Sequence, residues 1–281
     1  MSIGPQALML PDGRRLHLNH GPIDLIIEVW GPERDACYAA AIHRFETILT
    51  GLATELPILR TAYSEEMSLL DPVSLRMQDA VSSFAQDFVT PMAAVAGAVA
   101  DEILACMVQG RDVPKAYVNN GGDIAFHLSD GESFSSLSVG GHIVINSVDP
   151  ARGIASSGWR GRSHSLGIAD TVTVKAETAA KADVAATLIA NAVDVPNHPD
   201  ITRIAAVTLS PDSDLGARLV TTDVGPLPLH DIHKALDAGA ERAAHYRHQG
   251  LISEAALHLQ GHSRTIRSDS PTHSTKDVAH A

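Results

Sequence analysis

Apolar residues recur every three or four positions in several stretches of the chain, which predicts amphipathic helices. In the stretch 33–55 the recurring positions are Ala39, Ile42, Phe45, Ile48, Leu49 and Leu52. We expect this helix to end at Pro57. The same spacing predicts helices over 72–88, 92–107, 178–193 and 229–247, and Thr90-Pro91 begins the helix over 92–107.

Alternating or β-branched segments predict the strands. Thr171-Val172-Thr173-Val174 is β-branched throughout, and 23–30 is rich in Ile and Val. Further strands are expected at 14–18, 115–118, 124–128, 142–145, 204–209, 219–224 and 255–260. Strands and helices alternate irregularly and hairpins are present, so the predicted fold class is α+β rather than a doubly wound parallel sheet.

The chain has 281 residues, of which 44% are hydrophobic and only 4% aromatic. The core is therefore expected to consist mainly of Ala, Val, Leu and Ile. Helix 92–107 is so rich in Ala and Gly that a neighbour can approach its backbone closely. Residues 1–261 are predicted to form one domain. Residues 262–281 are rich in Ser, Thr and His without apolar periodicity, which predicts a disordered tail.

The formal net charge of −12 argues against nucleic acid as a partner, because an acidic surface repels phosphate backbones. The first ten residues lack the basic and apolar regions of a signal peptide. The apolar run 91–107 is interrupted by Asp101 and Glu102, and we expect it to be too short to span a membrane. A cytoplasmic location is the resulting expectation.

Two glycine-rich segments are candidates for ligand binding. Asn119-Asn120-Gly121-Gly122-Asp123 reads either as a hairpin turn or as a site where bare backbone N–H groups and Asp123 meet a ligand. The second segment, 152–164, combines hydroxyl groups, exposed amides and arginines, as anion-binding loops do. Its candidate residues are Ser156, Ser157, Gly158, Arg160 and Arg162, with His164 as a candidate acid or base.

Helix 178–193 carries a polar line in an otherwise apolar sequence. Asp183, Thr187 and Asn191 lie four residues apart, so they share one helix face. A carboxylate and a hydroxyl one turn apart are suitable ligands for a hard cation such as Mg²⁺. The alternative interpretation is a solvated stripe, in which these polar side chains only face water.

Taken together and in this order, these segments resemble the ApbE-like superfamily, whose best-known members are FAD-dependent protein FMN transferases. The motifs that carry the resemblance are Gly121-Gly122-Asp123-Ile124, Ala155-Ser156-Ser157-Gly158, Thr171-Val172-Thr173-Val174 and Ala182-Asp183-Val184-Ala185-Ala186-Thr187. The similarity is closer still to a branch of bacterial and archaeal ApbE-like proteins. Its hallmark stretches look like 90–97, 117–123, 157–163 and Gly167-Ile168-Ala169-Asp170.

The resemblance implies an ApbE-like fold with mixed or antiparallel sheets, packed helices and two lobes around one ligand cleft. It implies FAD or FMN as ligand, and Mg²⁺ held by Asp183, Thr187 and a backbone carbonyl near Val99. Two features depart from the transferases. Ala96 replaces their upstream lysine, and their H-I-I-D-P segment has no counterpart beyond His164 and the stretch 165–170.

The leading hypothesis is a protein that binds a phosphorylated, flavin-type nucleotide. In a transferase, Asp170 or His164 would activate the acceptor hydroxyl. One alternative is a non-catalytic accessory protein for redox or sulfur metabolism, and another is an enzyme acting on a small carboxylated metabolite. The partners that remain open are a redox enzyme and a second copy of this chain.

Overall fold

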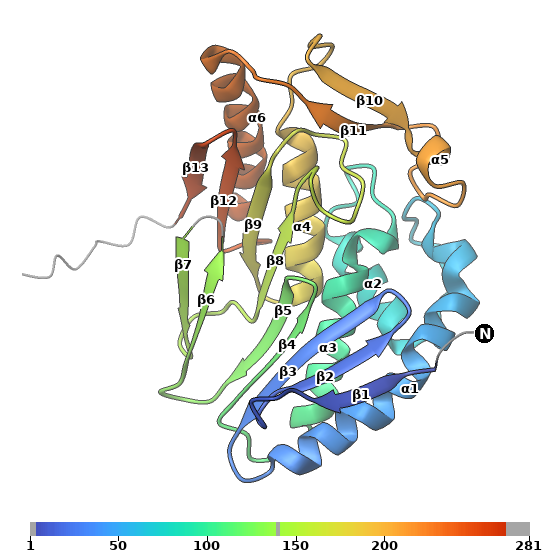
Figure 1. The fold of residues 1–281 in the computed structure, drawn as a ribbon, viewed down its shortest axis with the longest axis vertical. Helices are drawn as coiled ribbons and strands as arrows, with labels where there is room; N and C mark the ends of the chain where they lie inside the picture. Colours follow the sequence, from blue (N-terminus) through green and yellow to red (C-terminus); the bar gives the residue numbers. More distant parts are fainter. Residues whose placement is uncertain (1–3, 139–140, 268–281) are drawn as a thin grey trace, which may run out of the picture.

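The computed structural model describes residues 4–138 and 141–267. Within them, the chain forms one nine-stranded antiparallel sheet, two separate two-stranded sheets and six α-helices (Figure 1). The predicted α+β class is confirmed. The order of strands in the large sheet is β1-β2-β3-β4-β5-β8-β9-β12-β13. Their bounds are β1 Gln6–Met9, β2 Leu16–His20, β3 Ile23–Trp30, β4 Lys115–Asn120, β5 Asp123–Leu128, β8 Gly153–Ser157, β9 Thr171–Ala176, β12 Glu254–Leu259 and β13 His262–Ile266.

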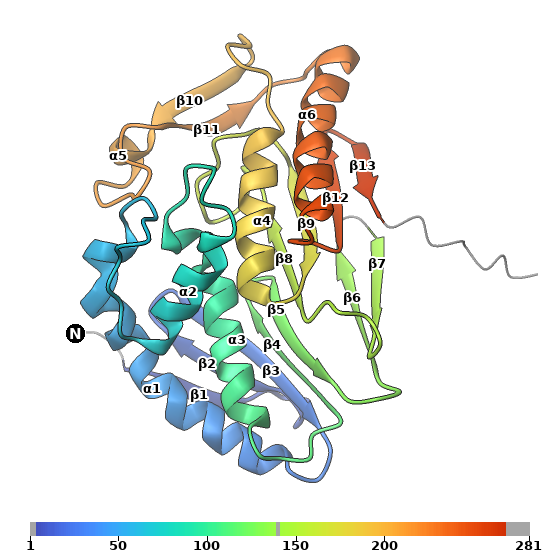
Figure 2. The same cartoon turned by 180° about the vertical axis from the view of Figure 1, so that it is seen from behind.

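The long helices cover one face of this sheet, as the two opposite views show (Figures 1 and 2). The helices are α1 Arg34–Leu59, α2 Pro72–Ser82, α3 Val95–Val108, α4 Ala179–Ala192, α5 Ala206–Leu209 and α6 Leu229–His248, with a 3-10 turn η1 at Pro91–Ala94. A hairpin of β6 (Ser133–Ser138) and β7 (Gly141–Asn146) leaves the sheet after β5. Phe134 and Ile145 of this hairpin pack on Phe126, whereas Ala125 belongs to the core under the helices. Strand β5 is therefore covered on both faces.

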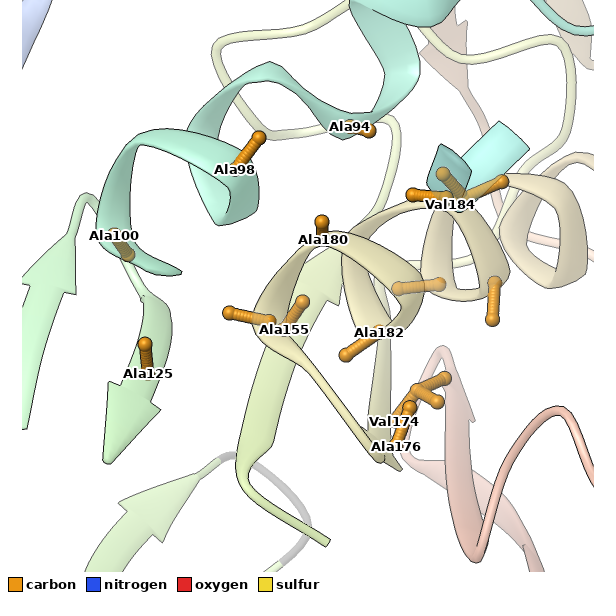
Figure 3. Packing of buried hydrophobic residues seen from close by; sticks show 14 of the residues in the cluster. Ala94, Ala98, Ala100, Ala125, Ala155, Val174, Ala176, Ala180, Ala182 and Val184 are labelled. Atoms are coloured by element: carbon orange, nitrogen blue, oxygen red, sulfur yellow. The ribbon is translucent and has the colours of Figure 1, made fainter. Parts of the chain in front are cut away.

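Helices α3 and α4 pack against each other through very small residues (Figure 3). Ala98 and Ala180 are buried, and a Cβ atom on Gly97 would lie under 3.0 Å from the Ala179 carbonyl. The expectation that a neighbour approaches this helix closely is confirmed, and that neighbour is α4. The contact brings the beginnings of the two helices together, which matters for the site described below.

Several predicted boundaries are wrong. Helix α1 continues through Pro57 to Leu59, because the missing N–H of Pro57 falls in the last turn, where the Arg60 N–H still reaches the Leu56 carbonyl at 3.1 Å. Helix α2 ends at Ser82 rather than at 88. The strand predicted over 204–209 is β10 (Ile201–Ala205) followed by α5, and β10 pairs with β11 (Leu219–Val224).

The predicted start of the disordered tail, at residue 262, is wrong, because His262–Ile266 form β13 and pair with β12. Gln260 and Gly261 both have positive φ, at 44° and 80°, as the two central residues of a type I′ hairpin turn require. An edge strand needs no apolar periodicity, which explains why its polar sequence gave no signal. The stretch 268–281 of the predicted tail lies outside the described residues.

Pro91–Val108 is the one helical segment of the described chain whose length and hydropathy would allow it to cross a membrane. In the protein, 56% of this window is buried, and α3 lies between α1, α4 and the sheet. A core helix passes the same test of length and composition, so this segment is weak evidence for a membrane span.

Candidate functional site

The hairpin between β4 and β5 supplies the first part of the site. Gly121 and Gly122 have φ values of 66° and 115°, which side chains other than glycine rarely tolerate. The Gly122 N–H donates to the Asn119 side-chain oxygen at 2.8 Å. Asn120 is 5% exposed, and its side chain donates to the Ala96 carbonyl at 3.0 Å. Asn120, a predicted ligand contact, therefore fixes the hairpin to the beginning of α3.

Asp123 is the first residue of β5 and is only 8% exposed. Its Oδ1 accepts a hydrogen bond from the Ser156 N–H at 3.2 Å, and β5 and β8 are neighbours in the sheet. Burial raises the pKa of Asp123 to about 7, opposed by the Ser156 hydrogen bond and by the positive charge of Arg162. The structure thus joins two segments that lie about thirty residues apart in the chain.

Asp183, in the second turn of α4, accepts a hydrogen bond from the Gly97 N–H at 3.1 Å. It keeps a small exposed surface, so it is not sealed from solvent. Burial first, and then the negative charge of Asp123, raise its pKa well above the ordinary value. Two carboxylates that destabilise each other's charged form make a place where a bound cation would be favoured.

Asp101 completes what we call the carboxylate cluster, Asp101, Asp123 and Asp183. Its two oxygens accept the N–H groups of Ala179 and Ala180 at 3.1 and 2.9 Å, which ties α3 to the first turn of α4. Burial raises its pKa to about 6. Asp101 was not among the predicted site residues, although a carboxylate inside the apolar run 91–107 was the available signal.

The arginine-rich segment leaves the sheet at the end of β8 as a loop over residues 158–170, which we call the arginine loop. Its base is closed by the Trp159 N–H, which donates to the Ala169 carbonyl at 3.0 Å. Gly158 is buried so closely against Asp170 that a Cβ atom would lie under 3.0 Å from the Asp170 carbonyl oxygen. The Ser156 hydroxyl, on β8, is hydrogen-bonded to the Thr173 hydroxyl at 2.9 Å.

The arginine loop meets the glycine hairpin through Arg162. The Arg162 guanidinium lies over Gly121, where it would contact any Cβ atom at under 3.0 Å. The other predicted loop residues are Ser157, which is partly exposed, and Arg160 and His164, which are exposed. The structure thus brings Gly121, Asp123 and Arg162 together.

The polar line of α4 divides into two parts. Thr187 follows Asp183 by one turn and is partly exposed. The Asn191 side-chain oxygen instead accepts hydrogen bonds from the Leu166 N–H and the Ser165 hydroxyl at 2.9 and 3.3 Å. Asn191 therefore holds the end of the arginine loop, and Asp183 with Thr187 remain the pair that could face a cation.

The donor set for Mg²⁺ is limited. Within residues 4–138 and 141–267, no group of three or more His, Cys, Asp or Glu side chains is arranged to hold a metal ion. Val99 is fully buried in α3, where its carbonyl faces along the helix toward the N–H four residues later. The raised pKa values of Asp123 and Asp183 mean that their charged forms are unfavourable here, and a nearby cation would favour them. Asp183 and Thr187 could supply only part of the oxygen ligands of such a cation.

The fold and the site together define an α+β protein with one large antiparallel sheet, in which an arginine-rich loop meets a glycine hairpin beside buried carboxylates. A family model described as "AbpE bacteria" matches residues 7–265, and the chain belongs to this family.

Curated relatives with the name "UPF0280 protein" are similar to part of the sequence. The protein from Methanothrix thermoacetophila is 42% identical over 130 residues, which cover 43% of this chain and 52% of the relative. Those from Methanococcus maripaludis strain C7 and Methanothermobacter thermautotrophicus are 38% and 35% identical over 144 and 132 residues. They are matched over 58% and 50% of their own lengths, so the chain spans about half the length of these relatives. The name states no ligand or reaction.

Proposed function

We propose that this protein binds a phosphorylated, flavin-type nucleotide between the arginine loop and the glycine hairpin. The observation that carries the proposal is the contact of Arg162 with Gly121 beside Asp123. Two arginines, Arg160 and Arg162, are exposed on a loop of an otherwise acidic protein, which is the chemistry that recognises phosphate. The resemblance to the wider ApbE-like superfamily, with its two lobes around a ligand cleft, belongs to the same proposal.

Each part of the site has its own role in this proposal. Arg160, Arg162 and the hydroxyl of Ser157 bind the phosphates. Asp123, at the buried end of the hairpin, accepts hydrogen bonds from the base or sugar end of the ligand. Asp183 and Thr187 hold Mg²⁺ together with phosphate oxygens, and the ion when bound neutralises charge on a pyrophosphate. We expect slow or absent cleavage of FAD, since the H-I-I-D-P segment of the transferases is missing from the sequence.

Titration calorimetry with FAD, FMN and riboflavin tests the proposal. FMN should bind more tightly than riboflavin, which lacks the phosphate, and Arg162→Ala should weaken FMN binding about tenfold or more, as expected for loss of a charge-assisted hydrogen bond of about 1.5–3 kcal/mol. Lys175→Ala, which removes a cation of β9 that pairs with Glu254, is the matched control and should leave binding unchanged. Absence of saturation at millimolar flavin would contradict the proposal.

Two other functions differ from this proposal in what the protein binds or in what co-purifies with it. An enzyme acting on a small carboxylated metabolite would bind carboxylates through the same arginines and would not bind flavin. An accessory protein for redox or sulfur metabolism would bind nucleotide without turnover and would co-purify with a partner enzyme. A cytoplasmic location is part of the proposed setting, and mass spectrometry of the small molecules that co-purify with the protein separates these cases.

A further inference from the structure

Asp170 lies at the closed end of the arginine loop, and all of its side-chain hydrogen bonds join parts of the protein to one another. Its Oδ1 accepts from the Trp159 indole N–H at 3.3 Å and from the Arg160 Nε at 3.1 Å. Its Oδ2 accepts from the Gln260 backbone N–H at 2.6 Å. All three partners are donors, so the carboxylate serves as an acceptor for groups of the chain itself.

The consequence for Arg160 is a fixed orientation. Its guanidinium carbon lies 4.5 Å from the centre of the Trp159 ring, and its Nε is held by Asp170. Trp159 in turn packs against the main core, so the stacked side chains of Arg160 and Trp159 are held against the rest of the protein. The Arg160 side chain is still 63% exposed, which leaves the outer side of the guanidinium free to meet an anion.

The Asp170 carboxylate is anchored to the turn between β12 and β13. Gln260 stands in the turn between β12 and β13, and its side chain bonds the Gly225 carbonyl at 2.7 Å and the Leu227 N–H at 3.0 Å. The Asp170 N–H donates to the His258 carbonyl at 2.9 Å. Asp170 is therefore bonded to the C-terminal hairpin on both its backbone and side-chain sides.

We infer that Asp170 is a positioning residue, which holds the Arg160 guanidinium against Trp159 so that a preset cation meets the phosphate of the ligand. A guanidinium fixed in advance loses less conformational entropy on binding than a free one. This role differs from the expectation that Asp170 activates an acceptor hydroxyl. We call the contacts of Asp170 with Arg160 and of Arg160 with Trp159 the clamp. The part of the inference that concerns the ligand rests on the proposed function, whereas the clamp itself does not.

The clamp is tested without any ligand. The chain has two tryptophans, so Trp30→Phe leaves Trp159 as the single reporter. Arg160 covers one face of the Trp159 ring. Asp170→Asn removes the charge and leaves one acceptor oxygen for three donors, so it should release Arg160 and raise the acrylamide quenching constant of Trp159 at least about twofold. Arg160→Ala should produce a similar rise, and the double variant no more than Arg160→Ala alone. Unchanged quenching in Asp170→Asn overturns the inference.

The effect on binding is tested with FMN and riboflavin as probes. Asp170→Asn should weaken FMN binding about tenfold and leave riboflavin binding nearly unchanged. In the Arg160→Ala background, Asp170→Asn should cause no further loss, because its effect passes through Arg160. An additive loss, or an equal loss for both probes, counts against the positioning role.

Two further results keep the outcomes separate. If the wild-type protein binds no flavin, the proposed function fails and the quenching experiment alone decides the clamp. If Asp170→Asn lowers the melting temperature too far for study, Trp159→Phe removes one donor to Asp170 while keeping an aromatic ring. That variant should reduce the preference for FMN over riboflavin about threefold, and an unchanged preference would speak against the inference.

Discussion

The backbone N–H of Gly97 donates a hydrogen bond to the Asp183 carboxylate at 3.1 Å, so the first turn of α3 and the second turn of α4 meet at one oxygen. The same two helices are joined a turn away, where Asp101 accepts the N–H groups of Ala179 and Ala180. The position of the carboxylate cluster therefore depends directly on how closely α3 and α4 approach.

Gly97→Ala should destabilise the protein by about 1–3 kcal/mol, as overpacking typically does. The added methyl group would lie under 3.0 Å from the Ala179 carbonyl, which is backbone and cannot rotate away. The gain in helix propensity from Gly to Ala is about 1 kcal/mol at most and does not compensate. Urea denaturation measures the change. Gly4→Ala, whose methyl group would meet no atom within 4 Å, is the control and should change stability by less than about 0.5 kcal/mol.

The ligand-free protein should lose stability through its buried carboxylates as the pH rises from about 4 to about 7. The pKa values of Asp101 and Asp123 are raised from 3.8 to about 6 and about 7. The native state then keeps protons that the unfolded chain has released, so the stabilisation is fully present below about pH 4 and is lost as the pH passes through these folded values.

Asp123→Asn should remove its share of this pH dependence, up to about 4 kcal/mol across the window for a pKa raised from 3.8 to about 7. The asparagine oxygen can still accept the Ser156 N–H. Urea midpoints at pH 4, 5.5, 7 and 8 provide the measurement. Asp212→Asn, at an exposed position, should retain the wild-type slope. If stability changed equally with pH in the wild type and in Asp123→Asn, Asp123 would not keep its proton in the native state between pH 4 and 7.

Mg²⁺ should bind weakly alone and more strongly in the presence of FAD, and each ligand should raise the affinity of the other by the same factor. Asp183→Asn keeps the side-chain shape and removes the charge, so the coupling should disappear while the fold survives. Calorimetric titration of each ligand with and without the other measures the factor. A solvated stripe would show no effect of the substitution, and rapid Asp183-dependent release of AMP from FAD would contradict the expected slow cleavage.

Truncation after Gly261 should lower the melting temperature by several degrees, because it removes β13 and leaves β12 at the edge of the sheet. It also removes the ion pair between Arg264 and Asp237 of α6. A chain that ends at Arg267 keeps both strands and is the matched control. Equal melting temperatures for the two chains would mean that β13 adds nothing to stability.

Local patterns were sufficient to predict many elements of the fold. The β-branched run 171–174 forms most of β9, and the predicted helix 178–193 is α4, whose N-cap Thr178 accepts the Lys181 N–H at 3.1 Å. Strand β8 was not predicted, because its sequence Gly-Ile-Ala-Ser-Ser has no clear alternation and it is held by pairing with β5 and β9. Such pairing joins distant segments and leaves no local signal.

The candidate site likewise has residues that local patterns predicted and residues whose roles depend on distant contacts. Residue types indicated Asp123, Arg162 and Asp183, and the structure brings Asp123 close to each of the other two. Sequence patterns could not show that Asn120 and Asp170 would be hydrogen-bonded within the protein, since a polar side chain beside a turn or in a loop looks the same whether its partner is a ligand or a backbone group. That distinction depends on tertiary contacts alone.

The small residues between α3 and α4 have a consequence for where this protein tolerates substitution. Where helices are separated by large side chains, a substitution that trims or enlarges one of them can shift a nearby site by small steps. Here Ala98 and Ala180 leave almost nothing to trim, and a methyl group added to Gly97 would meet the backbone of Ala179. The contact between α3 and α4 is therefore a poor place for substitutions, whereas Arg160 and Arg162 of the arginine loop are exposed and have room for change.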